Sequence, residues 1–135
     1  MKPSIFTRII RGEIPAYKIY EDEKTLVILD IHPVQPGHVL VIPKKQIVYF
    51  EDMPDDIYQA VWATVKLVAR HQKKILGKKY VGVSVVGTDV PHVHVHLIPF
   101  DESKEMHTKI DLTKKPNHPA LSAMVQRLAL KDKNE

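Results

Sequence analysis

Three histidines alternate with valines in the segment from His92 to His96, His-Val-His-Val-His. If this segment is a β-strand, successive side chains point to opposite faces, so His92, His94 and His96 share one face. Neighbouring histidines on that face would be roughly 6.5–7 Å apart, which is two strand rises. The valines then take the face that packs on the core, and the histidines face a cavity or solvent.

Such a row of imidazoles has three interpretations. A hydrated histidine face on an edge strand would have no chemical role. A metal site would need a third ligand from another strand, because three histidines along one strand span too far to share one ion. Covalent catalysis would use the middle histidine as a nucleophile toward phosphorus, since imidazole, with a pKa of about 6.5, is neutral at pH 7. We favour covalent catalysis, with the outer histidines holding an anionic group.

Composition narrows the class of protein. A chain of 135 residues is long enough for one domain and too short for two ordinary ones. The absence of cysteine excludes disulfides, thiolate catalysis and cysteine-based zinc sites. We expect a cytoplasmic protein with no membrane partner, because no signal peptide or spanning segment is recognisable. A dispersed net charge of +4 most often only keeps a surface soluble, and a diffuse preference for anionic partners is the sharper interpretation. No basic stripe is interleaved with aromatic residues, so nucleic-acid binding is not expected.

Local patterns predict the elements that position the histidines. A short helix over 5–10 is capped by Ser4 and ends near Gly12. A long helix starts at Pro54 and ends near Gly77, and a last helix covers about 119–131. Strands are expected over 17–20, 26–29, 38–42, 80–86 and 92–98, the last two joined by a tight turn at 87–89. The class is therefore α+β, with an antiparallel sheet of about five strands, one long helix and two shorter ones.

Three segments together resemble one known family. Residues 92–98 match the histidine triad motif, His-φ-His-φ-His-φ-φ with φ apolar, and residues 5–16 and 30–44 resemble its N-terminal and central signatures. The chain thus resembles the histidine triad (HIT) family, in its nucleotide-binding hydrolase branch. The resemblance implies a single HIT domain over 1–135, in which it covers 1–100 and leaves 101–135 as a variable tail with a helix.

The resemblance implies a role for each of four histidines. His94 stands where the nucleophile stands, and would attack the α-phosphorus of a nucleotide to form a nucleotidyl-histidine. His96 matches the histidine that contacts the phosphate. The carbonyl of His92 would accept the Nδ1–H of the nucleophile, and His38 would support the triad from the neighbouring strand. His38 could also simply begin a strand.

The resemblance further implies a nucleotide pocket. Asp30 matches the acid that grips the ribose hydroxyls, although it could be a loop cap. The apolar slot for the base, in which each member could also be plain core, is matched by Ile31, Phe6, Ile9, Ile14 and Leu40. Before the triad this chain departs from the family, since Asp89 takes the hydroxyl position and Thr88 the glutamine position. A carboxylate there would repel a phosphate, so Thr88 or backbone N–H groups could bind it instead.

Some relatives carry a structural zinc held partly by two cysteines. Ser4 and Thr7 stand at those positions here, and Gln46 stands where a histidine ligand often follows. Neutral hydroxyls are poor zinc ligands, so we expect no structural zinc, no metal and no cofactor.

The resemblance implies an enzyme acting on a purine nucleotide. The leading expectation is cleavage at the α-phosphate of nucleoside 5′-phosphoramidates or related conjugates. The alternatives are a dinucleoside polyphosphate hydrolase and a nucleotide-binding regulatory protein with weak activity. A homodimer is also implied, with the long helix and a sheet edge at the interface. Four residues of that helix could form a dimer patch or could equally be core: Tyr58, Val61, Trp62 and Val65.

Overall fold

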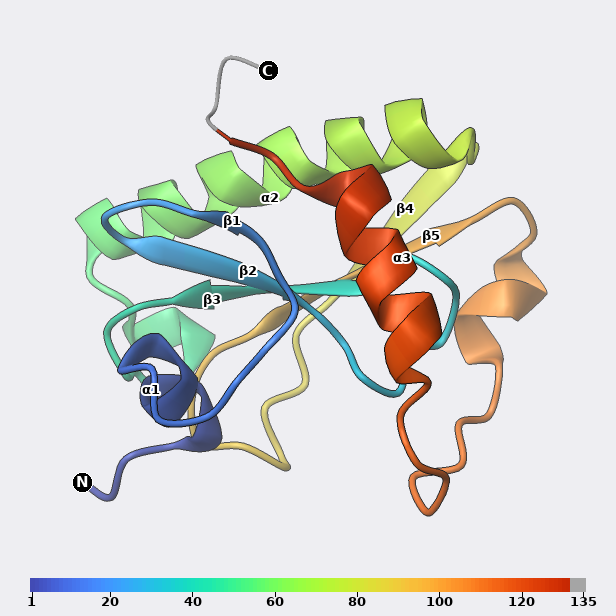
Figure 1. The fold of residues 1–135 in the computed structure, drawn as a ribbon. Coiled ribbons are helices and arrows are strands. Elements are labelled where there is room, and N and C mark those ends of the chain that lie inside the picture. Colours follow the sequence, from blue (N-terminus) through green and yellow to red (C-terminus); the bar gives the residue numbers. More distant parts are fainter. Residues whose placement is uncertain (132–135) are drawn as a thin grey trace.

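The computed structural model describes residues 1–131 of the chain as an α+β fold, shown in Figure 1. The elements, in chain order, are α1 (Ile5–Ile10), β1 (Lys18–Glu21), β2 (Thr25–Leu29), β3 (Val39–Pro43), the 3₁₀ turn η1 (Phe50–Asp52), α2 (Asp55–Leu76), β4 (Tyr80–Ser84), β5 (Val95–Phe100), the 3₁₀ turn η2 (Ser103–His107) and α3 (His118–Leu128). No helix in this described part is both long and apolar enough to cross a membrane.

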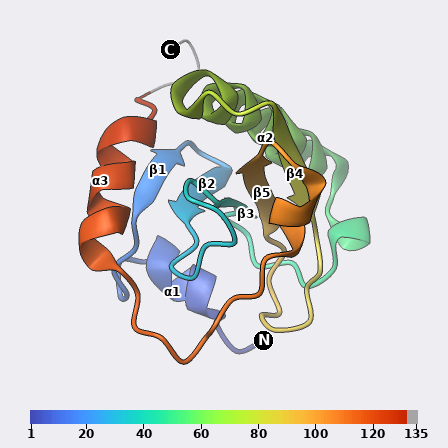
Figure 2. The same ribbon diagram turned by 90° about the vertical axis from the view of Figure 1, so that its right-hand side faces the viewer.

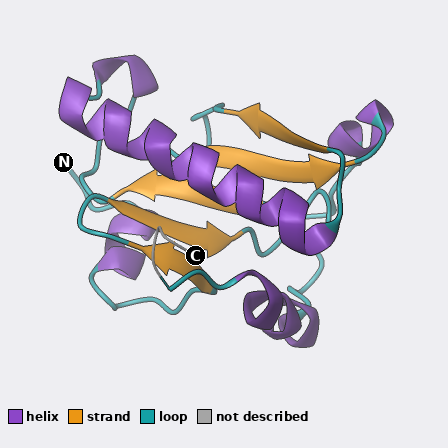
Figure 3. Cartoon of the chain, turned by 90° about the horizontal axis from the view of Figure 1, so that it is seen from above, coloured by secondary structure: helices purple, strands orange, loops and turns teal. Residues whose placement is uncertain are grey.

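The five strands form one antiparallel sheet in the order β1-β2-β3-β5-β4. The long helix α2 runs across one face of this sheet (Figure 3), and α1 lies on the other side (Figure 1). Helix α3 packs beside β1 and α2 at one flank (Figure 2). The predicted five-stranded antiparallel sheet with one long and two shorter helices is therefore confirmed.

Alternation along the strands divides the apolar residues between the two faces of the sheet. The face under α2 buries one set from β2, β3 and β5 together with helix residues. The opposite face buries a smaller cluster in which helix and strand residues meet: Phe6, Ile9, Leu26, Ile28, Leu40 and Ile42. Both faces of the central strands are thus covered, which explains why β2 and β3 are buried along their whole length.

Helix boundaries with strong local signals lie where the sequence predicts them. The side chain of Ser4 caps α1 by accepting the N–H of Thr7 at 3.0 Å. Helix α2 begins with two acids next to its positive dipole end and ends at Gly77, whose φ is +66°. On α3 the apolar side chains at helical spacing are buried or half-buried: Leu121, Met124, Val125 and Leu128.

Three predicted boundaries are wrong, and distant backbone partners account for the first two. Helix α3 ends at Leu128 rather than near 131, since Leu130 turns away to donate its N–H to the Ile19 carbonyl of β1 at 2.8 Å. Strand β5 begins at Val95 rather than His92, because the Val93 N–H bonds the Ile47 carbonyl outside the sheet. Strand β4 ends at Ser84, so residues 85–94 form a long connection in place of a tight turn at 87–89.

The last four residues of the predicted 101–135 tail lie outside the described residues. Between 101 and 131 the tail contains η2 and α3. The side chain of Gln35 donates to the Glu105 carbonyl at 3.0 Å and to Thr108 Oγ1 at 3.1 Å. The tail is therefore attached to the loop between β2 and β3.

Replacing Gly37 with alanine should destabilise the fold more than the same change at Gly77. Gly37 has a φ of +89°, and a Cβ there would overlap the Leu76 side chain. Gly77 also has a positive φ, but open space surrounds it. We expect Gly37→Ala to cost about 3 kcal/mol in the free energy of unfolding, from backbone strain plus overpacking, and Gly77→Ala about 1 kcal/mol. Urea unfolding of both variants measures the difference, and equal losses would contradict the packing at Gly37.

Candidate active site

The histidine row lies where the end of the 85–94 connection enters β5. Val93, Val95 and Leu97 are all buried beneath α2. The rings of His94 and His96 lie on the opposite face, 5.0 Å apart between centroids. The alternation expected of a strand is therefore kept, although the first two histidines precede the hydrogen-bonded ladder.

The ring of His94 is oriented by the backbone two residues earlier in the same segment. Its Nδ1 lies 2.8 Å from the carbonyl oxygen of His92. A carbonyl only accepts hydrogen bonds, so Nδ1 of His94 carries the proton and its Nε2 keeps the lone pair in the neutral ring. The ring of Phe6 packs against it with centroids 5.0 Å apart. His94 thus presents an unprotonated nitrogen with a nucleophile's lone pair.

His92 is fully buried and fixed at both nitrogens. Its Nε2–H donates to the Pro43 carbonyl at 2.7 Å, so Nδ1 accepts from the Ser4 hydroxyl at 2.7 Å. Burial lowers the pKa of His92, the Pro43 bond opposes this, and the nearby His94 lowers it further. A neutral, immobilised ring at this position holds the carbonyl that orients His94.

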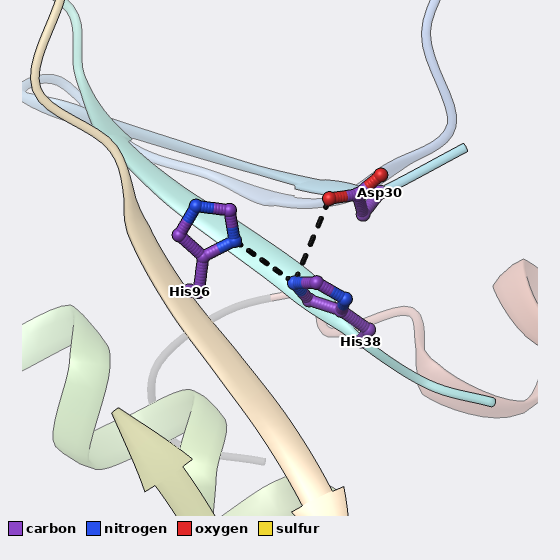
Figure 4. A group of neighbouring side chains, drawn as sticks. All are labelled: Asp30, His38 and His96. Atoms are coloured by element: carbon purple, nitrogen blue, oxygen red, sulfur yellow. Dashed lines mark hydrogen bonds and ion pairs between the residues drawn. The ribbon is translucent and has the colours of Figure 1, made fainter. Parts of the chain in front are cut away.

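The rings of His38 and His96 form a hydrogen-bonded pair, called the relay below and shown in Figure 4. Nδ1 of the buried His38 accepts the backbone N–H of Val34 at 3.0 Å. Its Nε2 must therefore carry the proton, and it donates to Nδ1 of His96 at 3.0 Å. This leaves Nε2 of His96 as an N–H donor. One backbone amide thus fixes the tautomers of two rings.

The relay is neutral. Burial lowers the pKa of His38 to about 4, against the Asp30 carboxylate, which raises it, and with His96, which lowers it. Burial and the neighbouring His94 lower the pKa of His96, and Asp30 opposes them. A proton added to Nδ1 of His96 would face the N–H of His38, so the hydrogen-bond pattern agrees with the direction of both pKa shifts.

Ligand atoms of Asp30, His38 and His96 lie within 4.8 Å of one another, which is close enough to surround a metal ion. However, Nε2 of His38 carries a proton as long as Nδ1 accepts the Val34 N–H. Coordination through that Nε2 would require the ring to give up this bond or to become an imidazolate. The arrangement therefore fits a hydrogen-bond relay better than a cation site.

The positions that hold zinc in some relatives form a hydrogen-bonded cluster here. The side-chain amide oxygen of Gln46 accepts from the Ser4 backbone N–H at 2.9 Å and from the Thr7 hydroxyl at 2.7 Å. The Ser4 hydroxyl in turn reaches His92 at 2.7 Å. Neutral hydroxyl and amide oxygens are poor zinc ligands and are already paired with one another, so this cluster does not fit a structural zinc.

The apolar residues expected around a base are only partly gathered. Phe6, Ile9 and Leu40 are buried together, with Ile14 packed against them, and the Phe6 ring links this cluster to His94. Ile31 is 43% exposed and does not belong to this cluster. It lines a cavity of about 190 Å³, together with Asp30, His38 and residues of α3.

The two residues expected near the phosphate lie on the connection that leads to the triad. Thr88 and Asp89 are both exposed on the 85–94 connection. Within the described residues, no hydrogen bond joins either side chain to the four histidines. Asp30, by contrast, lies next to the relay. Its Oδ2 is 3.6 Å from His38 Nε2, and its Oδ1 accepts the His32 N–H at 2.9 Å.

Several residues that support the site were not singled out from the sequence. Val34 acts through its backbone N–H, which no side-chain pattern reveals. The sequence indicates a helix cap at Ser4, and it marks Ser4, Thr7 and Gln46 as positions without zinc ligands, but it does not reveal their hydrogen bonds around His92. Gln72 carried a usable signal, since it lies four residues after Val68 on the apolar face of α2. A polar residue at a buried helix position indicates a specific hydrogen-bond partner.

A comparison with protein-family models matches residues 11–103 to the HIT domain. The chain belongs to the HIT family. An uncharacterized HIT-like protein of Methanocaldococcus jannaschii is 46% identical over 99 residues, 70% of this chain and 77% of that protein. A solved HIT-like protein of Bartonella henselae superposes with a TM-score of 0.79 at 29% identity, covering 93% of each chain. These matches confirm the predicted family and its fold.

Two further HIT relatives have names that state an activity. One is the adenosine 5′-monophosphoramidase HNT1 of Candida albicans, 36% identical over 70% of this chain and 68% of that protein. The other is the adenylylsulfatase HINT3 of Arabidopsis thaliana, 36% identical over 73% of this chain and 52% of that protein. The family of this chain therefore includes hydrolases that act on nucleotides.

Acid should destabilise the protein through His38. An unfolded histidine has a pKa of about 6.5, whereas folded His38 has one of about 4. Between these values the unfolded chain binds more protons, so stability present above pH 6.5 is lost as the pH falls toward 4. We expect His38 alone to account for roughly 3 kcal/mol of this loss in the free energy of unfolding.

The measurement is urea unfolding of wild type and His38→Gln between pH 7.5 and 4. The variant should lose less stability over this range, because it lacks the titrating group. Replacing the exposed His107 in the same way serves as the control and should leave the wild-type slope. Parallel pH curves for wild type and His38→Gln would show that His38 does not resist protonation.

Proposed function

We propose that this HIT protein hydrolyses nucleoside 5′-phosphoramidates or related nucleotide conjugates at the α-phosphate through a covalent nucleotidyl-His94 intermediate. The observation that carries this proposal is the bond from His94 Nδ1–H to the His92 carbonyl, which leaves the Nε2 lone pair available. Neutral imidazole in this tautomer is a nucleophile without any further activation.

The reaction has two displacements at phosphorus. In the first, Nε2 of His94 bonds the α-phosphorus while the bond to the leaving nitrogen breaks, and the leaving group departs as an amine after taking a proton from solvent. In the second, water attacks the same phosphorus, the electron pair of the phosphorus–His94 bond returns to Nε2, and a proton goes to solvent. The products are an amine and a nucleoside monophosphate.

His96 acts as a donor in this scheme and supplies no net proton. Its Nε2–H is a hydrogen-bond donor on the ring next to the nucleophile, and its Nδ1 is occupied by His38. Loss of the Nε2 proton would leave an imidazolate, because Nδ1 has no proton to keep. The role that fits is stabilisation of negative charge on the phosphate oxygens or the leaving group.

Substrate binding is proposed for the groups that flank the triad. The Asp30 carboxylate keeps acceptor capacity beyond its bond to His32 N–H, so it can take ribose hydroxyls. The cluster around Phe6 offers an apolar wall for a purine beside His94. Ile31 could contribute only from the side near α3, and Thr88 and Asp89 only if the 85–94 connection closes over the phosphate.

The relatives' names support this function without deciding the bond that is cleaved. A monophosphoramidase acts on a phosphorus–nitrogen bond and an adenylylsulfatase on a phosphoanhydride. The neutral donor at His96 favours an amine, which takes its own proton from solvent. A dinucleoside polyphosphate hydrolase is the alternative enzyme, and a nucleotide-binding regulator with weak activity is the alternative outside catalysis.

We propose that no metal or cofactor takes part, since the cluster of Ser4, Thr7, Gln46 and His92 is satisfied by hydrogen bonds.

A homodimer through strand β4 is also proposed, because β4 is an outer strand of the sheet with Tyr80 and Val83 exposed. On α2, Tyr58 is exposed, but Val61 and Val65 belong to the core under the helix and could not form a dimer patch.

Removing the nucleophile should abolish turnover. We expect His94→Ala to lower kcat for a nucleoside 5′-phosphoramidate by more than about 1000-fold, because neither neighbouring ring offers an unpaired nitrogen lone pair. The matched control is His71→Ala, which removes a half-buried histidine of α2 whose ring is hydrogen-bonded to the Leu128 carbonyl of α3. Acid quench followed by mass spectrometry should find a nucleoside monophosphate adduct on His94 of the wild type.

Three outcomes would contradict the proposal. They are an adduct that persists in His94→Ala, full turnover by that variant, and loss of wild-type activity in a chelator. Rates for phosphoramidates, adenylyl sulfate and dinucleoside polyphosphates, measured side by side, separate the alternative substrates. Nucleotide binding without turnover of any of them would favour the regulatory alternative.

A further inference from the structure

Gln72 is a fully buried polar residue on the long helix. It has 0% exposure and lies one helical turn after Val68, on the face of α2 that packs on the sheet. Burying an amide costs desolvation free energy unless its N–H and C=O groups find partners. The partners of Gln72 therefore indicate what this residue does.

The amide of Gln72 bridges two strands. Its Nε2 donates to the Gly37 carbonyl at 2.8 Å and to the Leu97 carbonyl at 3.1 Å. Both partners only accept, so the NH₂ group must face them and Oε1 must point away. Oε1 has no hydrogen-bond partner among the described residues. The residue is thus held by its two donors alone.

These two carbonyls flank the histidine relay. Gly37 directly precedes His38, and Leu97 directly follows His96. The ladder between β3 and β5 ends at the pair Val39–Leu97. Beyond that pair, no backbone ladder joins the segment of Gly37 to β5. The two hydrogen bonds from Gln72 connect the two segments there instead.

The relay needs these two bonds because its rings belong to separate segments, His38 just before β3 and His96 within β5. His38 Nε2 must stay 3.0 Å from His96 Nδ1, and the residues are 58 positions apart in the chain. A shift of about 1 Å between the two strand segments would break this bond. His96 could then place its proton on either nitrogen, and the donor toward the substrate would be lost from part of the molecules.

We propose that Gln72 is a positioning residue, which clamps the backbone at Gly37 and Leu97 so that His38 keeps His96 in its Nε2–H tautomer. Its effect on turnover rests on the proposed function, whereas its effect on the tautomer does not. Among the described residues, Gln72 donates hydrogen bonds to two backbone carbonyls and to neither ring, so it acts through the backbone. It contacts the site from the α2 side, opposite the face where substrate would bind.

The test compares Gln72→Met with Val68→Ala. Methionine has a similar length but no donors, so it removes both bonds. Val68 is 1% exposed on the same helix face, and its truncation loses packing while leaving the amide bonds intact. Nitrogen chemical shifts of the histidine rings at pH 7.5 report which nitrogen carries the proton. We expect His96 to be protonated at Nε2 in wild type and Val68→Ala, and to show a mixture of tautomers in Gln72→Met.

Kinetics with a nucleoside 5′-phosphoramidate give the second measurement. Gln72→Met should lower kcat roughly 10- to 100-fold with KM changed less than about threefold, since the misplaced donor lies at the reacting group. Wild-type tautomers in Gln72→Met, or an equal loss of kcat in Val68→Ala, would overturn the proposal. If Gln72→Met does not fold, Gln72→Asn, whose shorter amide cannot reach both carbonyls, is judged by the same criteria. If wild type has no turnover, the proposed function fails, and the tautomers alone still decide the role of Gln72.

Discussion

The packing of Val93, Val95 and Leu97 beneath α2 is the constraint on which the site depends. Burial of these three side chains fixes the rotation of the segment that carries the triad. A slip of one residue would turn all three histidines toward the core and expose the apolar side chains. The geometry of His94 and His96 is therefore stabilised by the same contacts that stabilise the sheet, and the chemistry needs no separate scaffold.

Backbone groups then decide where each proton lies. The carbonyls of His92 and Pro43 and the amide of Val34 each fix one ring nitrogen. Because backbone groups do not titrate, the tautomers stay the same over the pH range in which the rings remain neutral. Burial extends that range downward by lowering the pKa values of His38, His92 and His96. In the neutral rings, these hydrogen bonds leave one lone pair at His94 beside one N–H at His96.

Local signals were enough for part of this picture. The ends of α2 and the cap of α1 follow from Pro54, Gly77 and Ser4, whose effects act within a few residues. The start of β5 and the end of α3 could not be predicted, because they depend on the distant carbonyls of Ile47 and Ile19. Likewise the alternation of 92–96 predicts a shared histidine face, while the relay from Val34 through His38 to His96 requires contacts between remote segments.

The tail adds a constraint that the triad segment alone does not contain. Residues beyond 103 lie outside the family match, yet they bond the loop that follows Asp30. Gln35 reaches Glu105 and Thr108, and the ring of His32 lies 3.1 Å from the Lys114 carbonyl. That loop also carries Val34, the amide that fixes the relay. The part of the chain that matches the family thus supplies the histidine rings of the triad, and the tail is bonded to the loop whose Val34 amide sets the proton positions of His38 and His96.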